Sequence, residues 1–270
     1  MFWTGTLTER YLFAGRLITE SGLHVGGGRD NLTTTDSAVM KYIDDRPFIP
    51  GSSMKGAFRS AVERVALSLP GLRSCQLSKG VDPECPTMNA SEDDDLAADE
   101  EKQLENLQKL CHTCRLFGAP KLAGKTRFSD LSVIAATWAG LTEVRDGVGI
   151  DRDSERAMDQ IKYDYEVVPS GTEFDFRLVV ENPDAIQKEL GLIAVGLREL
   201  AAGMIPLGGI RTRGLGRCKL EGLTIHHLSF GDSTKFKVYL KTGRLDSDEF
   251  KLSDPQVKAL IDNEIDRLFE

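Results

Sequence analysis

The chain has 270 residues, 40% of them hydrophobic, and a formal net charge of −8 at pH 7. A chain of this length can bury a full hydrophobic core, and no apolar run reaches the length of a membrane span. The first residues lack the basic and then apolar segments of a secretory signal, so we expect a cytoplasmic protein without a membrane partner.

The acidic charge is concentrated in two segments. Residues 92–101 carry seven acidic side chains and no basic one, and residues 245–270 carry eight acidic against three basic. The rest of the chain therefore has a net charge of +4, with arginines and lysines clustered in glycine-rich stretches. The overall acidity does not exclude a nucleic-acid partner.

The chain begins with a predicted strand at residues 6–19, because apolar side chains alternate there, with Tyr11, Phe13 and Leu17 on one side. Residues 22–42 are rich in glycine and then in polar residues, which is typical of a loop shaped around a ligand. The chain then returns through a strand or hairpin that we predict at residues 39–49.

Residues 50–60, PGSSMKGAFRS, are predicted to form a short loop that leads into an amphipathic helix. Apolar side chains recur on one helical face at Met54, Ala57, Phe58, Ala61, Val62, Val65, Ala66 and Leu69. Ser52 or Ser53 is a suitable N-cap. Lys55 and Arg59 are four residues apart, close to a helix start whose N–H groups attract anions. We therefore expect this segment to hold phosphate; a capped surface helix with solvated basic side chains is the alternative.

The polar segment after this helix contains four of the five cysteines. Cys111 and Cys114 have the Cys-x-x-Cys spacing of a structural metal site, and Cys75 and Cys85 precede them. A tetrahedral zinc site is the favoured interpretation, because so polar an insertion buries little core and a metal would supply folding free energy. Disulfides and free buried thiols are the alternatives, and His112 could replace one sulfur.

The second half of the chain is predicted to combine strands, a helix and a projecting hairpin. Residues 125–135 and 173–180 have strand patterns. Between them, residues 142–172 are rich in Gly, Asp and Arg and are predicted to project as a hairpin. A helix capped by Asp184 follows, and the acidic C-terminal extension is expected to end in a helix at 254–269.

A second glycine-rich loop, LGGIRTRGLGRC, covers residues 207–218 and leads into a predicted strand. Its glycines let the backbone approach a ligand closely, and Arg211, Arg213 and Arg217 supply the charge that a phosphate backbone requires. A tight turn with surface arginines is the alternative.

The order of these elements predicts an α+β domain of ferredoxin-like or RRM-like type with elaborations. Seven motifs also resemble the RAMP superfamily, and specifically the repeated backbone subunits of type III CRISPR interference complexes, in a zinc-containing subtype. The motifs are GLHVGG at 22–27, TTDSAVMK at 34–41, FIPGSSMKGAFRS at 48–60, CHTCRLFG at 111–118, GIDRD at 149–153, YEVVPSGTEF at 165–174 and GGIRTRGLGR at 208–217.

The resemblance implies an RRM-like palm, a thumb hairpin and a zinc-binding insertion. The implied boundaries are 1–69 for the first part of the palm with the catalytic loop, 70–118 for the zinc-binding insertion, 119–141 for palm, 142–172 for the thumb, 173–229 for the second part of the palm with the glycine-rich loop, and 230–270 for the acidic C-terminal extension.

Such subunits stack along a guide RNA and hold its backbone. The implied RNA-binding residues are His24, Gly51, Ser52, Ser53, Lys55, Gly56, Arg59, Asp151, Arg152, Gly208, Gly209, Arg211, Arg213 and Gly214. For His24, a structural hydrogen-bonding role is the alternative. In the family the thumb displaces a base pair of the guide–target duplex at regular intervals, and an acidic loop residue cleaves the target RNA beside each gap.

The residue that matches this acidic loop residue is Asp36. An aspartate can hold a divalent cation, magnesium or manganese, or act as a base beside a 2′-hydroxyl. No second carboxylate adjoins it in sequence; Asp30, Asp44 and Asp45 are candidates only if the fold brings them in. The alternative is that Asp36 caps a turn.

The resemblance thus implies a guide-RNA-binding subunit of a type III CRISPR effector complex that cleaves target RNA. Its expected partners are the guide RNA, complementary target RNA and neighbouring subunits. One alternative is a purely structural subunit. The other is a guide-processing endonuclease of the same superfamily, which usually relies on histidine chemistry, and the four histidines of this chain show no clear base–acid pair.

Overall fold

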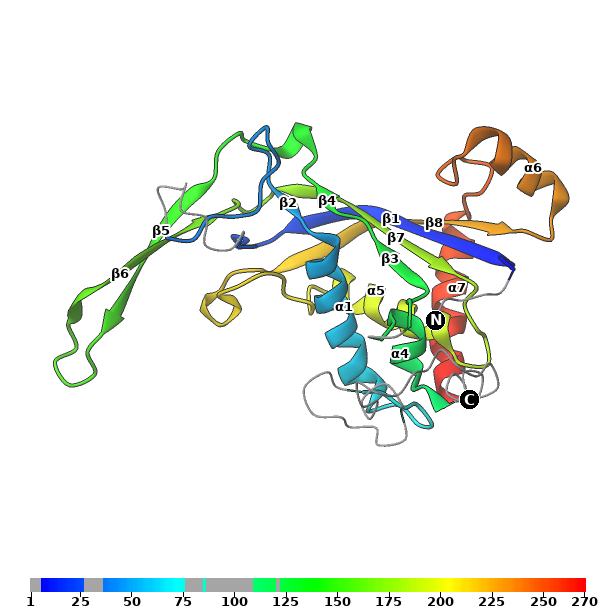
Figure 1. Ribbon diagram of the computed structural model, residues 1–270, viewed down its shortest axis with the longest axis horizontal. Helices are drawn as coiled ribbons and strands as arrows, with labels where there is room; N and C mark the ends of the chain where they lie inside the picture. Colours follow the sequence, from blue (N-terminus) through cyan, green and yellow to red (C-terminus); the bar gives the residue numbers. More distant parts are fainter. Residues whose placement is uncertain (1–5, 27–35, 76–84, 86–108, 120–121) are drawn as a thin grey trace, which may run out of the picture.

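A four-stranded antiparallel sheet lies at the centre of the computed structural model, which describes residues 6–26, 36–75, 85, 109–119 and 122–270 (Figure 1). Its strands, in spatial order, are β3 (Thr126–Phe128), β7 (Glu173–Glu181), β1 (Glu9–Thr19) and β8 (Cys218–Ser229). Helix α1 (Gly51–Ala66) follows β1 and α5 (Glu189–Ala201) follows β7. This βαββαβ order confirms the predicted α+β, ferredoxin-like fold.

The core lies between this sheet and its two helices, which cover the same face (Figure 1). Phe13 and Leu17 of β1 are buried there with Phe174, Phe176, Leu178 and Val180 of β7, as the alternating sequence pattern predicts. The helices α1 and α5 approach closely because a Cβ atom at Gly196 would lie 2.2 Å from the Phe58 ring. That contact sets the spacing between the middle of α1 and α5.

The opposite face of the sheet carries paired charges. Arg16 of β1 pairs with Glu173, and Arg177 pairs with Asp175 and Asp246. A small second core covers one end of this face, where α6 (Ser233–Thr242) packs on the sheet. Across the described strands, this face presents no Phe, Tyr or Trp, the side chains on which RRM domains stack bases.

The remaining elements surround this sandwich. A hairpin of β5 (Glu143–Ile150) and β6 (Ala157–Val167) projects from one end (Figure 1). The others are β2 (Phe48–Ile49), which pairs with β4 (Leu131–Ser132), α4 (His112–Phe117), α7 (Asp254–Asp266), and the 3-10 turns η1 (Ala135–Thr137), η2 (Arg211–Arg213) and η3 (Arg267–Phe269). The hairpin is the projecting one that composition predicted, while the domain boundaries stay a prediction.

Two predicted helix starts are wrong. Helix α1 begins at Gly51 with Pro50 as its N-cap, so Ser52 and Ser53 lie inside the first turn and neither is the cap. Helix α5 begins after Lys188, because the left-handed backbone of Lys188 (φ 54°) is not helical and separates α5 from the turn before it. Asp184 caps that turn. Capping side chains also occur in isolated turns, which sequence spacing does not distinguish from helix starts.

Candidate nucleic-acid interface and cysteine cluster

An open cleft of about 610 Å³ lies between α1 and two loops from distant parts of the chain. Its walls are formed by Val25, Gly26, Ser52, Ser53, Gly56, Ala57, Ser60, Arg64, Ile205, Pro206, Gly208, Gly209 and Arg211. The fold thus brings together six of the predicted RNA-binding residues. Two arginines and the first turn of a helix border the cleft, which is a suitable arrangement for phosphate groups.

The two loops are held together by backbone contacts at His24. Gly209 N–H donates to the His24 carbonyl oxygen at 2.8 Å. Gly208 has a φ of +75°, and a Cβ atom there would lie 2.2 Å from the same oxygen. Glycine is therefore required at position 208, both for the backbone conformation and for the close approach.

The start of α1 is fixed from the side of the sheet. Gly51 N–H donates to Asp130 Oδ1 at 2.7 Å, and a Cβ atom at Gly51 would lie 2.4 Å from the Phe128 carbonyl oxygen. Gly51 therefore serves the packing of α1, while Ser52 and Ser53 are exposed toward the cleft.

Lys55 and Arg59 share one face of α1, as predicted, but they do not line the cleft. Arg59 donates to Glu63 Oε1 at 2.6 Å, to the Gly118 carbonyl at 2.9 Å and toward Cys114 Sγ at 3.7 Å. Lys55 is half-buried and lies 3.4 Å from the Thr126 carbonyl; burial and then the Arg59 charge lower the pKa of its ammonium group. The predicted phosphate contacts of these two side chains have no support in this arrangement.

Arg64 is the basic residue of α1 that reaches the cleft, and the sequence interpretation missed it. Ser53, Gly56, Ser60 and Arg64 fall at i, i+3, i+7 and i+11, which places them on one helical face. This spacing was available in the sequence as a signal. The sequence interpretation chose Lys55 and Arg59 because Lys55 lies nearer the helix start, and the RNA contacts of these two residues stay a prediction.

Asp36 is exposed and lies at the root of the projecting hairpin. Its backbone N–H donates to Asp164 Oδ1 at 2.7 Å, and the Asp164 N–H donates back to Asp36 Oδ2 at 3.0 Å. Asp44 instead pairs with Arg46 at 2.7 Å, and Asp30 lies outside the described residues. The carboxylate that the fold brings to Asp36 is therefore Asp164, 128 residues away, for which local sequence offered no signal.

Glu166 fixes the segment that follows Asp36 onto the hairpin. Its buried carboxylate accepts hydrogen bonds from the Val39 N–H at 3.0 Å, from the Lys41 ammonium and from the Thr142 hydroxyl. Burial alone would raise the pKa of Glu166, but these donors, Lys41 first, outweigh it and lower the pKa. The segment is thus anchored by one charged group.

His24 makes structural hydrogen bonds, and its predicted RNA contact stays a prediction. It is buried, and its Nδ1 lies 2.6 Å from the Glu166 carbonyl oxygen, which can only accept, so Nδ1 carries a proton. Its Nε2 lies 3.2 Å from the Ser37 hydroxyl, and its ring meets Tyr165 edge-on with centroids 5.9 Å apart. His24 therefore joins the hairpin, the Asp36 segment and the glycine-rich loop.

Arg213 links the glycine-rich loop to the hairpin. Its guanidinium donates to the Tyr163 hydroxyl and lies 6.0 Å from the centre of that ring. A Cβ atom at Gly147, on the paired strand, would lie 2.2 Å from Tyr163, so the glycine makes room for the ring. Gly214 ends the η2 turn in a left-handed conformation, with a φ of +86°.

At the hairpin tip, Asp151 closes the turn. Its Oδ1 accepts from the Asp153 and Ser154 N–H groups, both at 2.9 Å, and these bonds, Ser154 first, lower the pKa of Asp151. Arg152 is exposed beside it. Val148 and Ile150, near the tip, are 51% and 64% exposed, so the hairpin presents apolar side chains to solvent.

The four predicted cysteine ligands converge. Cys75, Cys85, Cys111 and Cys114 are buried, and their sulfur atoms all lie within 4.8 Å of one another. Four sulfurs bound to one zinc ion at about 2.3 Å would lie about 3.8 Å apart, so the cluster can hold such a metal. His112 Nδ1 accepts from the Arg73 N–H at 3.0 Å, so the four-sulfur set needs no substitution by His112.

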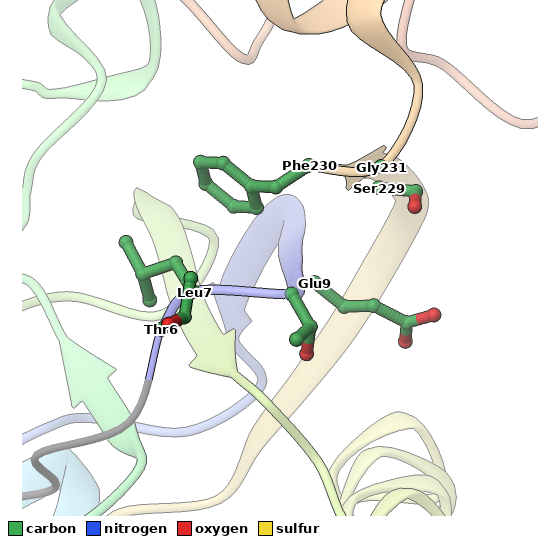
Figure 2. Close-up of a pocket in the computed structure, with 7 residues that line it drawn as sticks. Thr6, Leu7, Glu9, Ser229, Phe230 and Gly231 are labelled. Carbon is green, nitrogen blue, oxygen red and sulfur yellow. The ribbon is translucent and has the colours of Figure 1, made fainter.

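A second pocket lies at the far end of β1 and β8. It is lined by Thr6, Leu7, Thr8, Glu9, Ser229, Phe230 and Gly231, and Figure 2 shows Leu7 and Phe230 beside it. This lining includes no cationic side chain. The first cleft is therefore the better candidate for a nucleic-acid backbone.

The fold and the cleft define a ferredoxin-like α+β protein with an elaborated hairpin and a glycine-rich loop. The profile of the RAMP superfamily matches residues 16–219, and the chain belongs to this superfamily. This confirms the resemblance seen in the motifs.

Two curated relatives match the chain. One is the CRISPR system Cms endoribonuclease Csm3 of Methanothermobacter thermautotrophicus, which is 25% identical over 246 residues that cover 80% of this chain and 86% of the relative. The other, with the same name, from Methanocaldococcus jannaschii, is 38% identical over 61 residues, which cover 22% of this chain and 25% of the relative. Among the described residues, no helix has the length and apolar character needed to span a bilayer.

Proposed function

We propose that this protein is a backbone subunit of a type III CRISPR effector complex that binds guide RNA and cuts complementary target RNA with Asp36. The observation that carries the proposal is the placement of one exposed aspartate at the root of a projecting hairpin, joined through His24 to the cleft of α1 and the glycine-rich loop. The name of the curated relatives, an endoribonuclease of a CRISPR system, supports the same class of activity.

In this proposal the cleft holds the guide backbone. Ser52 and Ser53 line the cleft from the first turn of α1, and Arg64 and Arg211 add two positive charges to its lining. These groups suit phosphate and sugar atoms, which carry no sequence information, so the subunit accepts guides of any sequence. Neighbouring subunits would bind successive stretches of the same guide.

The reaction in this proposal depends on the Asp36 carboxylate. Within the described part of the chain, Asp36 Oδ2 accepts the Asp164 N–H, and Oδ1 has no hydrogen-bond partner. Oδ1 can therefore take a proton from a 2′-hydroxyl or hold a divalent cation.

A magnesium or manganese ion fits this chemistry only with the help of the substrate. Apart from the cysteines, the described residues contain no group of three side chains that could hold a metal. Magnesium is commonly held by one or two carboxylates and substrate phosphates, so Asp36 would hold it together with RNA oxygens. When bound, the ion would neutralise charge that develops on the scissile phosphate.

The alternative of a histidine-based guide-processing enzyme has little support. Both ring nitrogens of His24 are engaged in structural contacts, and His226 and His227 lie on β8, in a different part of the fold from the cleft. A purely structural subunit remains the second candidate, since it would need the cleft but not Asp36.

Asp36→Asn in the assembled complex tests the proposal. Removing a catalytic acid–base group typically lowers the rate by roughly 100-fold to 10,000-fold, so single-turnover cleavage of complementary RNA in magnesium should fall by that factor while RNA binding is unchanged. Asp44→Asn is the matched control, because Asp44 is also exposed but pairs with Arg46. Cleavage at the parental rate by Asp36→Asn would show that Asp36 is not the catalyst, so that either another carboxylate of this chain cuts the RNA or the chain is a structural subunit and a different subunit cuts.

We also propose that the cysteine cluster holds one structural zinc ion. The convergence of four buried sulfurs in a polar insertion supports it, and zinc is the metal for which a tetrahedral four-thiolate site is most typical.

A further inference from the structure

We infer that Asp164, on strand β6, is a positioning residue that holds the Asp36 carboxylate in its working orientation. The inference rests on the proposed function of Asp36. It assigns a role in the reaction to a residue of the hairpin itself.

The geometry of the pair is reciprocal. Each aspartate donates its backbone N–H to a carboxylate oxygen of the other, at 2.7 and 3.0 Å. Two such bonds form a closed ring and define both the backbone direction at Asp36 and the rotation of its side chain. A single contact to an exposed side chain would leave that rotation free.

The backbone around Asp36 is already fixed by neighbouring contacts. Ser37 forms a parallel bridge with Tyr165, and its carbonyl accepts the Glu166 N–H at 2.9 Å. The Glu166 carboxylate accepts the Val39 N–H. Residues 37–39 are thus held along β6. Asp164 bonds to the residue just before them, Asp36, whose side chain is exposed.

Asp164 faces one side of the hairpin only. It lies opposite Asp146 in the β5–β6 register, while Tyr163 and Tyr165 alternate to the other side. Arg213 contacts Tyr163, so the glycine-rich loop meets that other side. The Asp36–Asp164 pair and the Arg213 contact therefore lie on opposite sides of the hairpin. An RNA duplex that received the hairpin would meet the Asp36–Asp164 pair on one side and the glycine-rich loop on the other.

Asp146 provides a matched control within the same hairpin. It is the cross-strand neighbour of Asp164 and is exposed, but its carboxylate pairs with Lys162 at 3.1 Å and has no hydrogen bond to Asp36. If cleavage depends only on the negative charge of the hairpin, replacing either Asp146 or Asp164 would lower the cleavage rate. A loss caused by misplacement of Asp36 would appear at Asp164 alone.

The test compares Asp164→Ala, Asp164→Asn and Asp146→Asn in the assembled complex with guide RNA. Single-turnover cleavage of complementary RNA gives the rate, and the Kd is measured with a target that has a 2′-deoxy nucleotide at each cut site. We expect Asp164→Ala to cut about 100-fold more slowly with an unchanged Kd, the loss typical of a catalytic group displaced by about 1 Å. Asp164→Asn should cut near the parental rate, because its side-chain oxygen still accepts the Asp36 N–H. Asp146→Asn should be parental.

A second measurement does not depend on cleavage or assembly. Hydrogen exchange of the Asp36 amide in the isolated chain should be faster in Asp164→Ala than in the parent and in Asp164→Asn, because that amide donates to the Asp164 side chain. Unchanged exchange in Asp164→Ala would overturn the inference.

The kinetic outcomes separate the inference from the function on which it rests. A parental rate in Asp164→Ala, while Asp36→Asn is inactive, would overturn the inference alone. An Asp164→Asn variant as slow as Asp164→Ala would show that the Asp164 charge is required in the reaction, which also overturns a positioning role. A parental rate in Asp36→Asn would overturn the proposed function and the inference together. A double variant supports the inference if it is no slower than the single one. Because Asp164 acts only through Asp36, the cleavage rate of Asp36→Asn with Asp164→Ala should equal that of Asp36→Asn alone.

Discussion

Glu166 is the single residue on which most of the candidate site depends. Its side chain is 10% exposed, and its carboxylate, backbone N–H and carbonyl contact three different parts of the chain: residues 37–41, Thr142 and His24. A buried carboxylate with several donors is favourable only while the donors remain, because a buried charge without partners is costly.

Glu166→Gln should therefore destabilise the protein by about 1–3 kcal/mol at neutral pH, since the negative charge beside Lys41 is lost and one of the two acceptor oxygens, which serve Val39 and Lys41 separately, is replaced by an N–H₂ group that cannot accept. The effect should depend on pH. Because the folded-state pKa of Glu166 is lowered, its contribution is complete above the ordinary glutamate pKa of 4.5 and is lost as pH falls through the folded value.

The thermal midpoints of parent and Glu166→Gln, measured from pH 7 to pH 3, should therefore converge as the pH falls. A constant difference over that range would contradict the charged role of Glu166. Glu143→Gln is the control, because Glu143 is half exposed and its ion pair with Arg145 is a surface pair.

Two glycines of the same loop separate steric crowding from backbone strain. Gly208 and Gly214 both have positive φ, but a Cβ atom at Gly208 would lie 2.2 Å from the His24 carbonyl, while nothing lies within 4 Å of one at Gly214. Gly214→Ala should cost about 1 kcal/mol, the strain of a left-handed residue, and Gly208→Ala should cost clearly more. Urea unfolding of both variants measures the difference, and equal costs would argue against the close contact with His24.

At the scale of elements, the cysteine cluster joins the insertion to the palm. Helix α4 begins at the cluster, with Cys111 Sγ accepting the Cys114 N–H at 3.4 Å. Arg59 of α1 reaches toward Cys114, and a site with four thiolates and one zinc ion carries a net charge of −2 that this guanidinium partly offsets. Arg59 thus contacts the insertion, and its predicted RNA contact stays a prediction.

Cys111→Ser should release the metal and lower the melting temperature, because the sequence of the insertion is polar and a bound metal would supply folding free energy there. Elemental analysis of the parent should give about one zinc per chain by the four-ligand rule. Cys218→Ser is the control, because Cys218 is buried in β8 within the main core, and it should keep the zinc. A parent without zinc, or a Cys111→Ser variant that keeps it fully, would contradict the assignment.

Elements with strong periodicity could be predicted from the sequence, and contacts between them could not. The alternation in β1 and β7 and the apolar face of α1 follow from local patterns, and so do the four cysteines. The pairing of Asp36 with Asp164 depends on the register of a distant strand. Arg59 and Arg64 lie on different faces of α1, as their spacing predicts, but the packing of α4 against the Arg59 face, which the sequence does not show, leaves the Arg64 face to the cleft.

On the scale of the whole molecule, the faces differ in how their charges are used. The outer face of the sheet holds its arginines in ion pairs, such as Arg16 with Glu173. The cleft presents Arg64 and Arg211, and the described residues offer neither of them an ion pair. A net charge of −8 therefore conceals one face that is suited to a polyanion.

This difference predicts where RNA binding depends on salt. Each cation that contacts a phosphate releases counterions, so the slope of log K against log salt concentration changes by about 0.7 for each contact to single-stranded RNA. Arg211→Gln and Arg64→Gln should each weaken binding to unrelated RNA sequences to a similar degree and reduce the slope by about that amount.

Arg16→Gln is the matched control, since Arg16 is 52% exposed but lies on the outer face, and its slope should equal that of the parent. Fluorescence titrations with two unrelated RNAs between about 50 and 200 mM salt would measure all three slopes, the range over which phosphate contacts have a large effect. A reduced slope in Arg16→Gln, with parental slopes in the two cleft variants, would place the RNA on the sheet face, as in RRM domains, and would remove the cleft from the proposed function.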